Sequence, residues 1–446
     1  MPYIHPNRRW SRTPCHTPFL HPGVSSNASA APKRNILDGL VVSGVVATLE
    51  IPDIVPDCAS TDAAIRNVEC IGSFDWVDSK IPTIIVPSCP PEWMGDTKLP
   101  FTLNPDVPTT VPNHKQYHLS GPSYALLPVI QAADAMTKAV DWPSVDFIVS
   151  RNFLTKLLRW IRGSSRKDGG GWYDFRLDLE LVGGKTVLFT RWDAGVWDGY
   201  SHSRSYGLNF EKATTSPAKG CDNGKMGHHR IVKYDFLGMT FVVRSQVDAC
   251  LPVPPGAENI DMGGLHTVGQ PSISNVAAPL SNLKLSCGTM TSPSPSPSQA
   301  SPLEESPDTL RVIHAGREVP QDAIIELTTR SAYWLSNTRW GEIYPALYLS
   351  QTPHFYIGLQ KRGTFYDIQK RTLEDKEFAA HKKEVDMSLR KLGEALKTIQ
   401  KLALAAAEHG RDKRLSLVCV SGELKVYELV SMESCLPEGT RRRFKA

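Results

Sequence analysis

The chain has 446 residues and a formal net charge of +4. This length suits one large domain or two ordinary ones, and so mild a charge does not by itself indicate nucleic-acid binding. The nine cysteines form no CxxC pair and no spaced Cys/His cluster, which argues against a zinc site or a disulfide framework and fits a reducing compartment.

The N-terminal segment and the apolar runs of the chain predict no membrane role. No apolar run is long enough to span a bilayer. The N-terminal segment lacks the apolar core of a signal peptide and is rich in proline. We therefore expect a disordered tail over residues 1–35 and a protein of the nucleus or cytoplasm that is not secreted.

The first half of the remaining chain predicts strands followed by helices. The β-branched run at 36–54 predicts a strand, and residues 68–93 predict a strand and an extended segment bounded by prolines. Apolar residues at helical spacing predict helices over 123–140 and 153–161. Alternating runs on either side of Gly183 and Gly184 predict a β-hairpin.

The second half adds another hairpin, over 228–249 with its turn near Leu237 and Gly238. Residues 251–308 are rich in Pro, Ser and Gly and predict a long disordered insertion. Beyond it we expect the following elements: strands at 309–317, 323–330 and 354–363, a helix at 339–350 interrupted by Pro345, a long helix at 373–410 capped by Gly410, and a closing hairpin at 415–430. The insertion interrupts one α+β domain, which we place at 36–446.

Acidic residues stand near the ends of several short predicted elements. They are Glu211 in GLNFE, Asp248 in VVRSQVDA and Glu326 in AIIELTTR. Alternate residues of a strand share a face, so Gln246 lies with Asp248, and Thr328 with Glu326. If the two strands were neighbours, these side chains would converge, with Glu211 as a third carboxylate. Mg²⁺ and Mn²⁺ prefer such oxygen ligands, and a metal pair can drive phosphoryl displacement.

Each acid also has an ordinary structural interpretation. An aspartate that ends a strand usually caps a turn, and a glutamate within a strand is more often exposed at an edge than bound to a metal. Clustered acids indicate a functional site only in a probabilistic sense.

The order and wording of several segments resemble the DXO-type family of RNA 5′-end decapping nucleases. The segments VECIGSF, SRNFLTKLL, YDFRLDLELVGGKTVLFTR, TPHFYIGLQ and LSLVCVSGELKVYEL are similar to stretches of that family. GLNFE fits its Gly-x-x-x-Glu motif, VVRSQVDA its Glu-x-Asp motif and AIIELTTR its Glu-Leu-Lys motif. The resemblance runs from Val68 to the end of the chain, and the ordered set is more specific than any one motif.

The resemblance implies a fold, a chemistry and partners, and the sequence would be a divergent, fungal-type member. The implied fold is a single α+β domain with a mixed central β-sheet flanked by helices and a PD-(D/E)XK-like nuclease core. The implied activity is decapping pyrophosphohydrolase, deNADding or 5′-3′ exonuclease chemistry on RNA 5′ ends, with one or two Mg²⁺ or Mn²⁺ ions. A 5′-3′ exoribonuclease is an expected partner.

Carried over residue by residue, the resemblance assigns roles to five positions. Glu211, Asp248 and Glu326 match the catalytic, metal-binding carboxylates, and the backbone carbonyl of Leu327 would be a further ligand. Arg151 matches an arginine that contacts phosphate.

Three positions depart from the family pattern. Gln246 replaces the first acid of Glu-x-Asp, Thr328 replaces the lysine of Glu-Leu-Lys, and Ala346 stands where a helical glutamine is expected. Gln246 keeps an oxygen but loses a charge, so it would be a weak ligand. Three functions therefore stay open: a weakened decapping nuclease, a catalytically impaired protein that binds RNA or a partner, and a DNA nuclease on the same core.

Overall fold

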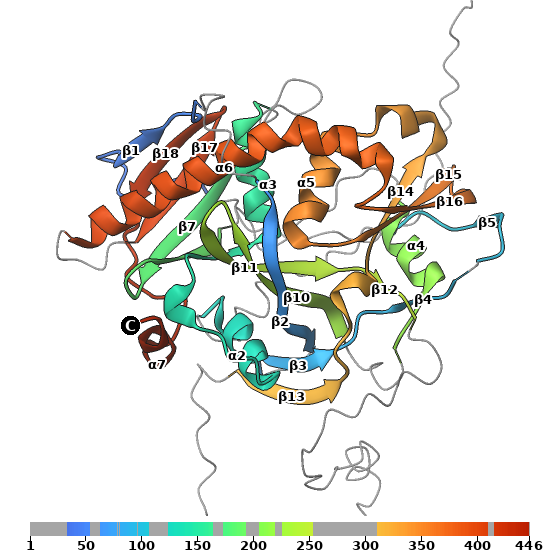
Figure 1. The fold of residues 1–446 in the computed structure, drawn as a ribbon, viewed down its shortest axis with the longest axis horizontal. Helices are drawn as coiled ribbons and strands as arrows, with labels where there is room; N and C mark the ends of the chain where they lie inside the picture. Colours follow the sequence, from blue (N-terminus) through green and yellow to red (C-terminus); the bar gives the residue numbers. More distant parts are fainter. Residues whose placement is uncertain are drawn as a thin grey trace, which may run out of the picture.

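The computed structural model describes residues 34–53, 63–77, 79, 81–95, 97–106, 124–163, 173–192, 205–218, 225–252, 310–408 and 414–445. These residues form two mixed β-sheets and a set of helices (Figure 1), so the predicted α+β class is confirmed. Most of the tail and of the insertion that we expect to be disordered lies outside the described residues.

The larger sheet has eleven strands within the described residues. Their order across the sheet is β1 (Ala47–Leu49), β18 (Glu423–Glu428), β17 (Leu415–Val420), β7 (Phe175–Val182), β8 (Thr186–Arg191), β6 (Phe147–Ser150), β11 (Met239–Val247), β10 (Lys225–Phe236), β2 (Ile65–Val77), β3 (Thr83–Ser88) and β13 (Arg311–Gly316). β6 runs parallel to both β8 and β11, while the hairpins β7–β8, β10–β11 and β17–β18 are antiparallel as predicted.

The smaller sheet has seven strands in the same part of the chain. Their order is β5 (Phe101–Thr102), β16 (Thr364–Thr372), β15 (His354–Lys361), β14 (Ile324–Ser331), β12 (Ala249–Cys250), β4 (Glu92–Trp93) and β9 (Thr215–Ser216). β14 and β15 are parallel, with Glu326 opposite Phe355.

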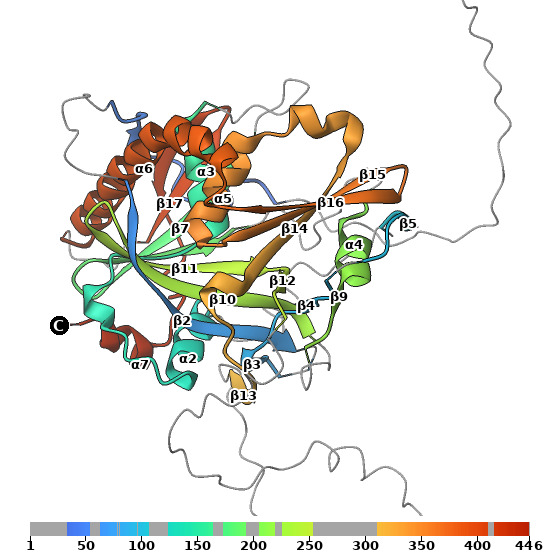
Figure 2. The same ribbon diagram turned by 45° about the vertical axis from the view of Figure 1, so that its right-hand side comes forward.

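The chain passes from β11 of the larger sheet to β12 of the smaller one (Figure 2), and Asp248 is the residue between these strands. β11 ends at Val247, and β12 begins at Ala249, where it pairs with Ile325 of β14. We expected residues 241–248 and 323–328 to be possible neighbours in one sheet. They lie in different sheets, and only the two residues after Asp248 pair with β14, because the chain leaves the larger sheet at this residue.

Helices cover both faces of the larger sheet. They are α2 (Leu127–Ala135), α3 (Arg151–Ile161), α5 (Trp340–Ser350) and α6 (Lys376–Glu408). The described residues also contain α4 (Gly207–Thr214), which contacts β14 and β9 of the smaller sheet, and the short helix α7 (Glu438–Arg441). The buried face of α3, with Phe153, Leu157 and Ile161, repeats every three to four residues and packs into one core with α5 and α6. The core on the opposite face contains α2. None of the helices in the described ranges combines the length and apolarity needed to cross a membrane.

α5 is continuous through Pro345, whereas the sequence predicts an interruption there. A proline inside a helix leaves the carbonyl four residues earlier without its N–H partner. Here that carbonyl belongs to Gly341, and it accepts a hydrogen bond from the Arg162 guanidinium of α3. The tertiary contact therefore replaces the bond that Pro345 removes.

Two further predictions are wrong in length. Within the described part of the apolar run, residues 36–53, only Ala47–Leu49 forms a strand, because Gly39 turns the chain at φ 75° and the run lies at the edge of the larger sheet. The helix expected over 123–140 is confined to Leu127–Ala135, and Thr137 beyond it has a left-handed φ of 54°.

The turn between β7 and β8 offers a test of how the C-terminal segment is held. Gly183 has φ 59°, and a Cβ there would overlap the backbone of Phe444, a buried residue near the C-terminus. Gly183→Ala should lower the free energy of unfolding by about 1–2 kcal/mol from backbone strain alone, and by more from the clash. Urea unfolding would measure it. Gly184→Ala is the matched control, because its Cβ would meet open space, and equal effects of the two substitutions would contradict the packing described.

Candidate active site

Arg151 and Glu326 form an ion pair between the two sheets. Arg151 is the first residue of α3, directly after β6, and Glu326 lies on β14. Arg151 Nη1 donates to Glu326 Oε2 at 2.6 Å and Nη2 to Oε1 at 3.2 Å. Burial opposes the charge of Arg151, but Glu326 outweighs it and the pKa of the guanidinium is raised on balance. The predicted phosphate-binding arginine thus holds both oxygens of a predicted metal ligand.

Asp248 lies where the chain changes sheets, and its carboxylate joins them. Its Oδ2 accepts a hydrogen bond from the backbone N–H of Leu327 at 2.8 Å. Burial, followed by the charges of Glu326 and Glu211, raises the pKa of Asp248 well above its usual range. The backbone bond and Arg151 oppose this shift but do not cancel it.

Glu211 comes from α4, which packs against β14. Asp106 fixes the start of this helix, because its carboxylate accepts hydrogen bonds from the N–H groups of Leu208 and Asn209. Burial raises the pKa of Glu211 to about 7, and the charges of Glu326 and Asp106 add to the shift. The three acids singled out from the sequence therefore share one electrostatic environment, although they come from three separate elements.

The donor set fits a hard divalent cation chemically. Three half-buried, like-charged carboxylates are unfavourable unless a proton or a cation lies among them, and Mg²⁺ and Mn²⁺ take carboxylate oxygens. The arrangement is not closed around an ion, since no group of three His, Cys, Asp or Glu side chains within the described ranges is placed to hold a metal. Both oxygens of Glu326 are directed to Arg151.

Gln246 is not brought to these residues by any hydrogen bond in the described part of the chain. Its side chain is exposed and lies against Gly227 of β10, with Nε2 3.1 Å from the position that a Cβ would take there. Its role as a weak ligand stays a prediction, as does that of the Leu327 carbonyl.

The other two departures, Thr328 and Ala346, line one cavity together with Glu326. The cavity has a volume of about 710 Å³ and lies between β14, α3 and α5. Thr328 comes from β14 and Ala346 from α5. The places where the family resemblance expects a lysine and a glutamine therefore adjoin the same space beside the acidic cluster.

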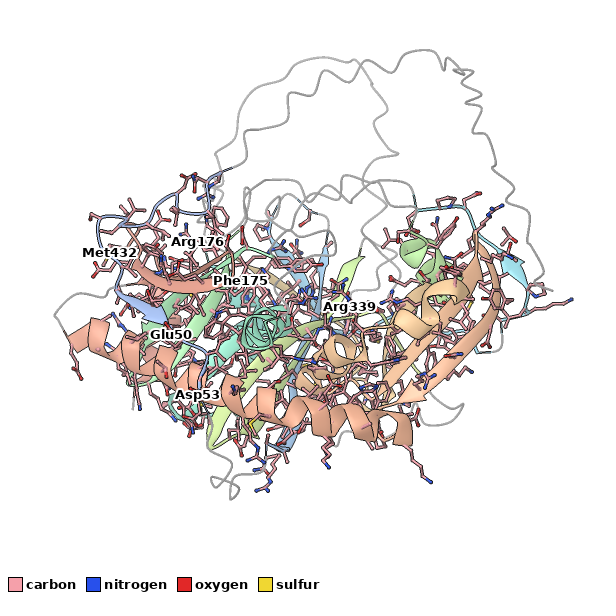
Figure 3. The ribbon with its side chains drawn as sticks, turned by 90° about the horizontal axis from the view of Figure 1, so that it is seen from above. Glu50, Asp53, Phe175, Arg176, Arg339 and Met432 are labelled. Atoms are coloured by element: carbon pink, nitrogen blue, oxygen red, sulfur yellow. The ribbon has the colours of Figure 1, made fainter. Side chains whose placement is uncertain are left out.

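Sequence reasoning missed the arginines of this cavity. Arg159, Arg330 and Arg339 line it, and Figure 3 shows Arg339 near the middle of the molecule. A smaller adjoining cavity is lined by Arg151, Arg159 and Arg162. One signal was available for Arg330, because it alternates with Glu326 and Thr328 along a predicted strand and so shares their face.

Comparison with known proteins identifies the family of the chain. The model of a family described as a domain of unknown function, DUF8563, matches residues 48–445. The chain belongs to the DUF8563 family. No curated protein matches it.

Solved structures similar to this DUF8563 member are Rai1 and Dxo1 proteins. S. pombe Rai1 has 11% sequence identity and a TM-score of 0.49, and the match covers 86% of this chain and 99% of that one. Candida albicans Rai1 in complex with pU5-Mn²⁺ has 9% identity, a TM-score of 0.48, and coverage of 86% and 93%. K. lactis Dxo1 in complex with manganese has 8% identity, a TM-score of 0.47, and coverage of 87% and 97%. These similarities agree with the family that the sequence motifs resemble.

The raised pKa of Glu211 predicts a pH dependence of stability in metal-free protein. Because the folded-state pKa, about 7, exceeds the ordinary value of 4.5, the folded state binds the proton more tightly. The contribution of this group to stability is therefore present at low pH and is lost as pH rises from about 4.5 through about 7. Glu211→Gln should be more stable than wild type at pH 8, and this advantage should vanish by pH 5, as urea unfolding across this range would measure.

The control is Glu50→Gln, since Glu50 is exposed and is labelled on the left side of the molecule in Figure 3, away from Arg339 near the middle. It should be indistinguishable from wild type throughout. A Glu211→Gln curve that runs parallel to wild type from pH 5 to pH 8 would contradict the buried, charge-coupled environment of Glu211.

Proposed function

We propose that this protein acts on RNA 5′ ends as a divalent-metal-dependent nuclease of the decapping type, with a low rate. The supporting observation is the coupling of Glu211, Asp248 and Glu326, which the motifs single out in advance and which come from α4, the sheet junction and β14. The chemistry is hydrolysis of a phosphate ester or anhydride at the 5′ end: pyrophosphohydrolase, deNADding or 5′-3′ exonuclease activity.

In this proposal the three carboxylates hold Mg²⁺ or Mn²⁺, with the Leu327 carbonyl as a further ligand and Gln246 as a weak one. A bound ion of this kind supplies an activated water and stabilises charge on the phosphate oxygens. Arg151 holds the phosphate. A guanidinium has five N–H donors, and Glu326 engages one on each terminal nitrogen, so the others can face a substrate while the ion pair persists.

The low rate follows from the residues at two positions. Thr328 offers no charge where the DXO-type motif has a lysine. The loss of a positioned donor of this kind commonly lowers the rate by about 10²–10³-fold. Gln246 reduces the negative charge available to a cation. Such losses need not add, because residues that act as a unit are not independent.

An assay of purified full-length protein with Mn²⁺ tests the proposal. The substrates are NAD-capped, unmethylated-capped and 5′-triphosphate RNA. We expect slow product formation from at least one of them, a loss of at least about 10²-fold in Asp248→Asn, and no change in Glu50→Gln. No product from any substrate, or equal product from wild type and Asp248→Asn, would refute the enzymatic proposal.

A second function is favoured by one contact, the two-point ion pair between Arg151 and Glu326. A carboxylate neutralised by arginine has less need of a metal ion, which suits a protein that binds RNA ends or a partner such as a 5′-3′ exoribonuclease without turnover. A nuclear or cytoplasmic location belongs to either version.

Restoring the family residues separates the two functions. The Gln246→Glu/Thr328→Lys double variant should hydrolyse the same RNA faster than wild type by about 10²-fold or more if the wild-type site is impaired by these residues. Initial rates at saturating Mn²⁺ are the measurement, with each single variant assayed beside it. A wild type as fast as the double variant would exclude the non-catalytic function.

A further inference from the structure

The strand β14 presents three side chains in a row to the large cavity. Glu326, Thr328 and Arg330 occupy every second position of β14 and so point to the same face of the strand. All three line the cavity. A positive charge is therefore present on this face, two residues after Thr328, which stands where the DXO-type motif has a lysine.

The Arg330 guanidinium turns back toward Thr328. Its Nη1 donates to Thr328 Oγ1 at 3.3 Å and to the backbone carbonyl of Thr329 at 3.0 Å. The charge thus lies beside the Thr328 hydroxyl and not out in solvent, and these two bonds restrict the side chain before any ligand arrives.

Arg330 has no carboxylate partner among the described residues. Its two hydrogen bonds go to neutral oxygens of its own strand. The pKa of the guanidinium is lowered by burial, with no acidic neighbour to offset the effect. A half-buried arginine in this state gains more from an anion than one already paired with a glutamate, because the desolvation has already occurred.

The rest of the cavity wall is also weighted toward positive charge. Arg159 and Arg339 donate to the two different oxygens of the single carboxylate of Glu342. Glu326, the other acid of the lining, is bonded to Arg151. Both glutamates of the cavity lining are therefore bonded to arginines, and Arg330 adds a positive charge that neither of them neutralises.

We propose that Arg330 takes over the role of the lysine that is missing at 328. With Arg330, this cavity binds the 5′-phosphates of RNA without a metal ion. The ligand class is a terminal mono- or triphosphate on a short single strand. Arg330 donates to the phosphate oxygens from β14, while Arg159 and Arg339 line the route along which further phosphates extend. The inference rests on the proposed function only for the choice of RNA as the ligand.

The test is binding in EDTA by the full-length protein. The probes are one fluorescent pentaribonucleotide with a 5′-triphosphate, with a 5′-monophosphate and with a 5′-hydroxyl, titrated by anisotropy. Wild type should bind the phosphorylated forms at least about tenfold more tightly than the hydroxyl form, and Arg330→Gln should lose about ten- to a hundredfold of that affinity. Arg330→Lys should keep part of it.

Two further variants separate a direct role from a structural one. Arg362→Gln, an exposed arginine in the β15–β16 turn, should bind as wild type. The Thr328→Lys/Arg330→Gln double variant should recover the affinity, because it returns the charge to the position of the family lysine. Equal affinity of wild type and Arg330→Gln, or no preference for 5′-phosphate in wild type, would overturn the proposal, as would a double variant no better than Arg330→Gln.

Failure of this inference and failure of the proposed function give different results. Metal-free binding that depends on Arg330 without any hydrolysis in Mn²⁺ refutes the enzyme and leaves the binding site standing. Hydrolysis that depends on Asp248, with binding in EDTA unaffected by Arg330→Gln, does the reverse.

Discussion

The arrangement of the two sheets depends on the point where the chain leaves the larger sheet and enters the smaller one. Asp248 is the single residue between β11 and β12, and its carboxylate accepts the N–H of Leu327 on β14. This bond fixes the smaller sheet against the end of the larger one, and it also fixes Glu326, the neighbour of Leu327. A half-buried carboxylate in this role carries a desolvation cost, and its pKa is raised accordingly.

The site around this junction is a balance between carboxylates and arginines. The carboxylates of Glu211, Asp248 and Glu326 repel one another in a partly desolvated environment. Arg151 relieves the repulsion at Glu326. A lysine at 328, as in the DXO-type motif that this segment resembles, would have contributed to the same balance from β14. Arg330 restores that charge from two residues further along, with its guanidinium returned toward the Thr328 hydroxyl. The departure from the DXO-type motif at Thr328 is thus partly compensated within the same strand.

Local patterns predicted most of the elements, because their causes are local. The hairpin turns at Gly183 and at Leu237–Gly238 need left-handed backbone, and the helix from Arg151 has an apolar face at helical spacing. The errors arose where distant residues intervene. The carbonyl freed by Pro345 finds Arg162 of another helix, so α5 continues. The apolar run at 36–54 lies at a sheet edge, where most of it has no strand partner.

The sequence alone determined the α+β class, the resemblance to a known family and the identity of the acids that belong together, since motifs and alternation are carried by neighbouring residues. Only the tertiary structure decided that these acids meet at a junction between two sheets, and that Arg151 holds Glu326. It also decided that Arg159 of α3, Arg330 of β14 and Arg339 at the start of α5 line one cavity. Those facts depend on pairing and packing between separate segments, such as Arg151 and Glu326, which are 175 residues apart, and no local pattern encodes which charges such segments bring together.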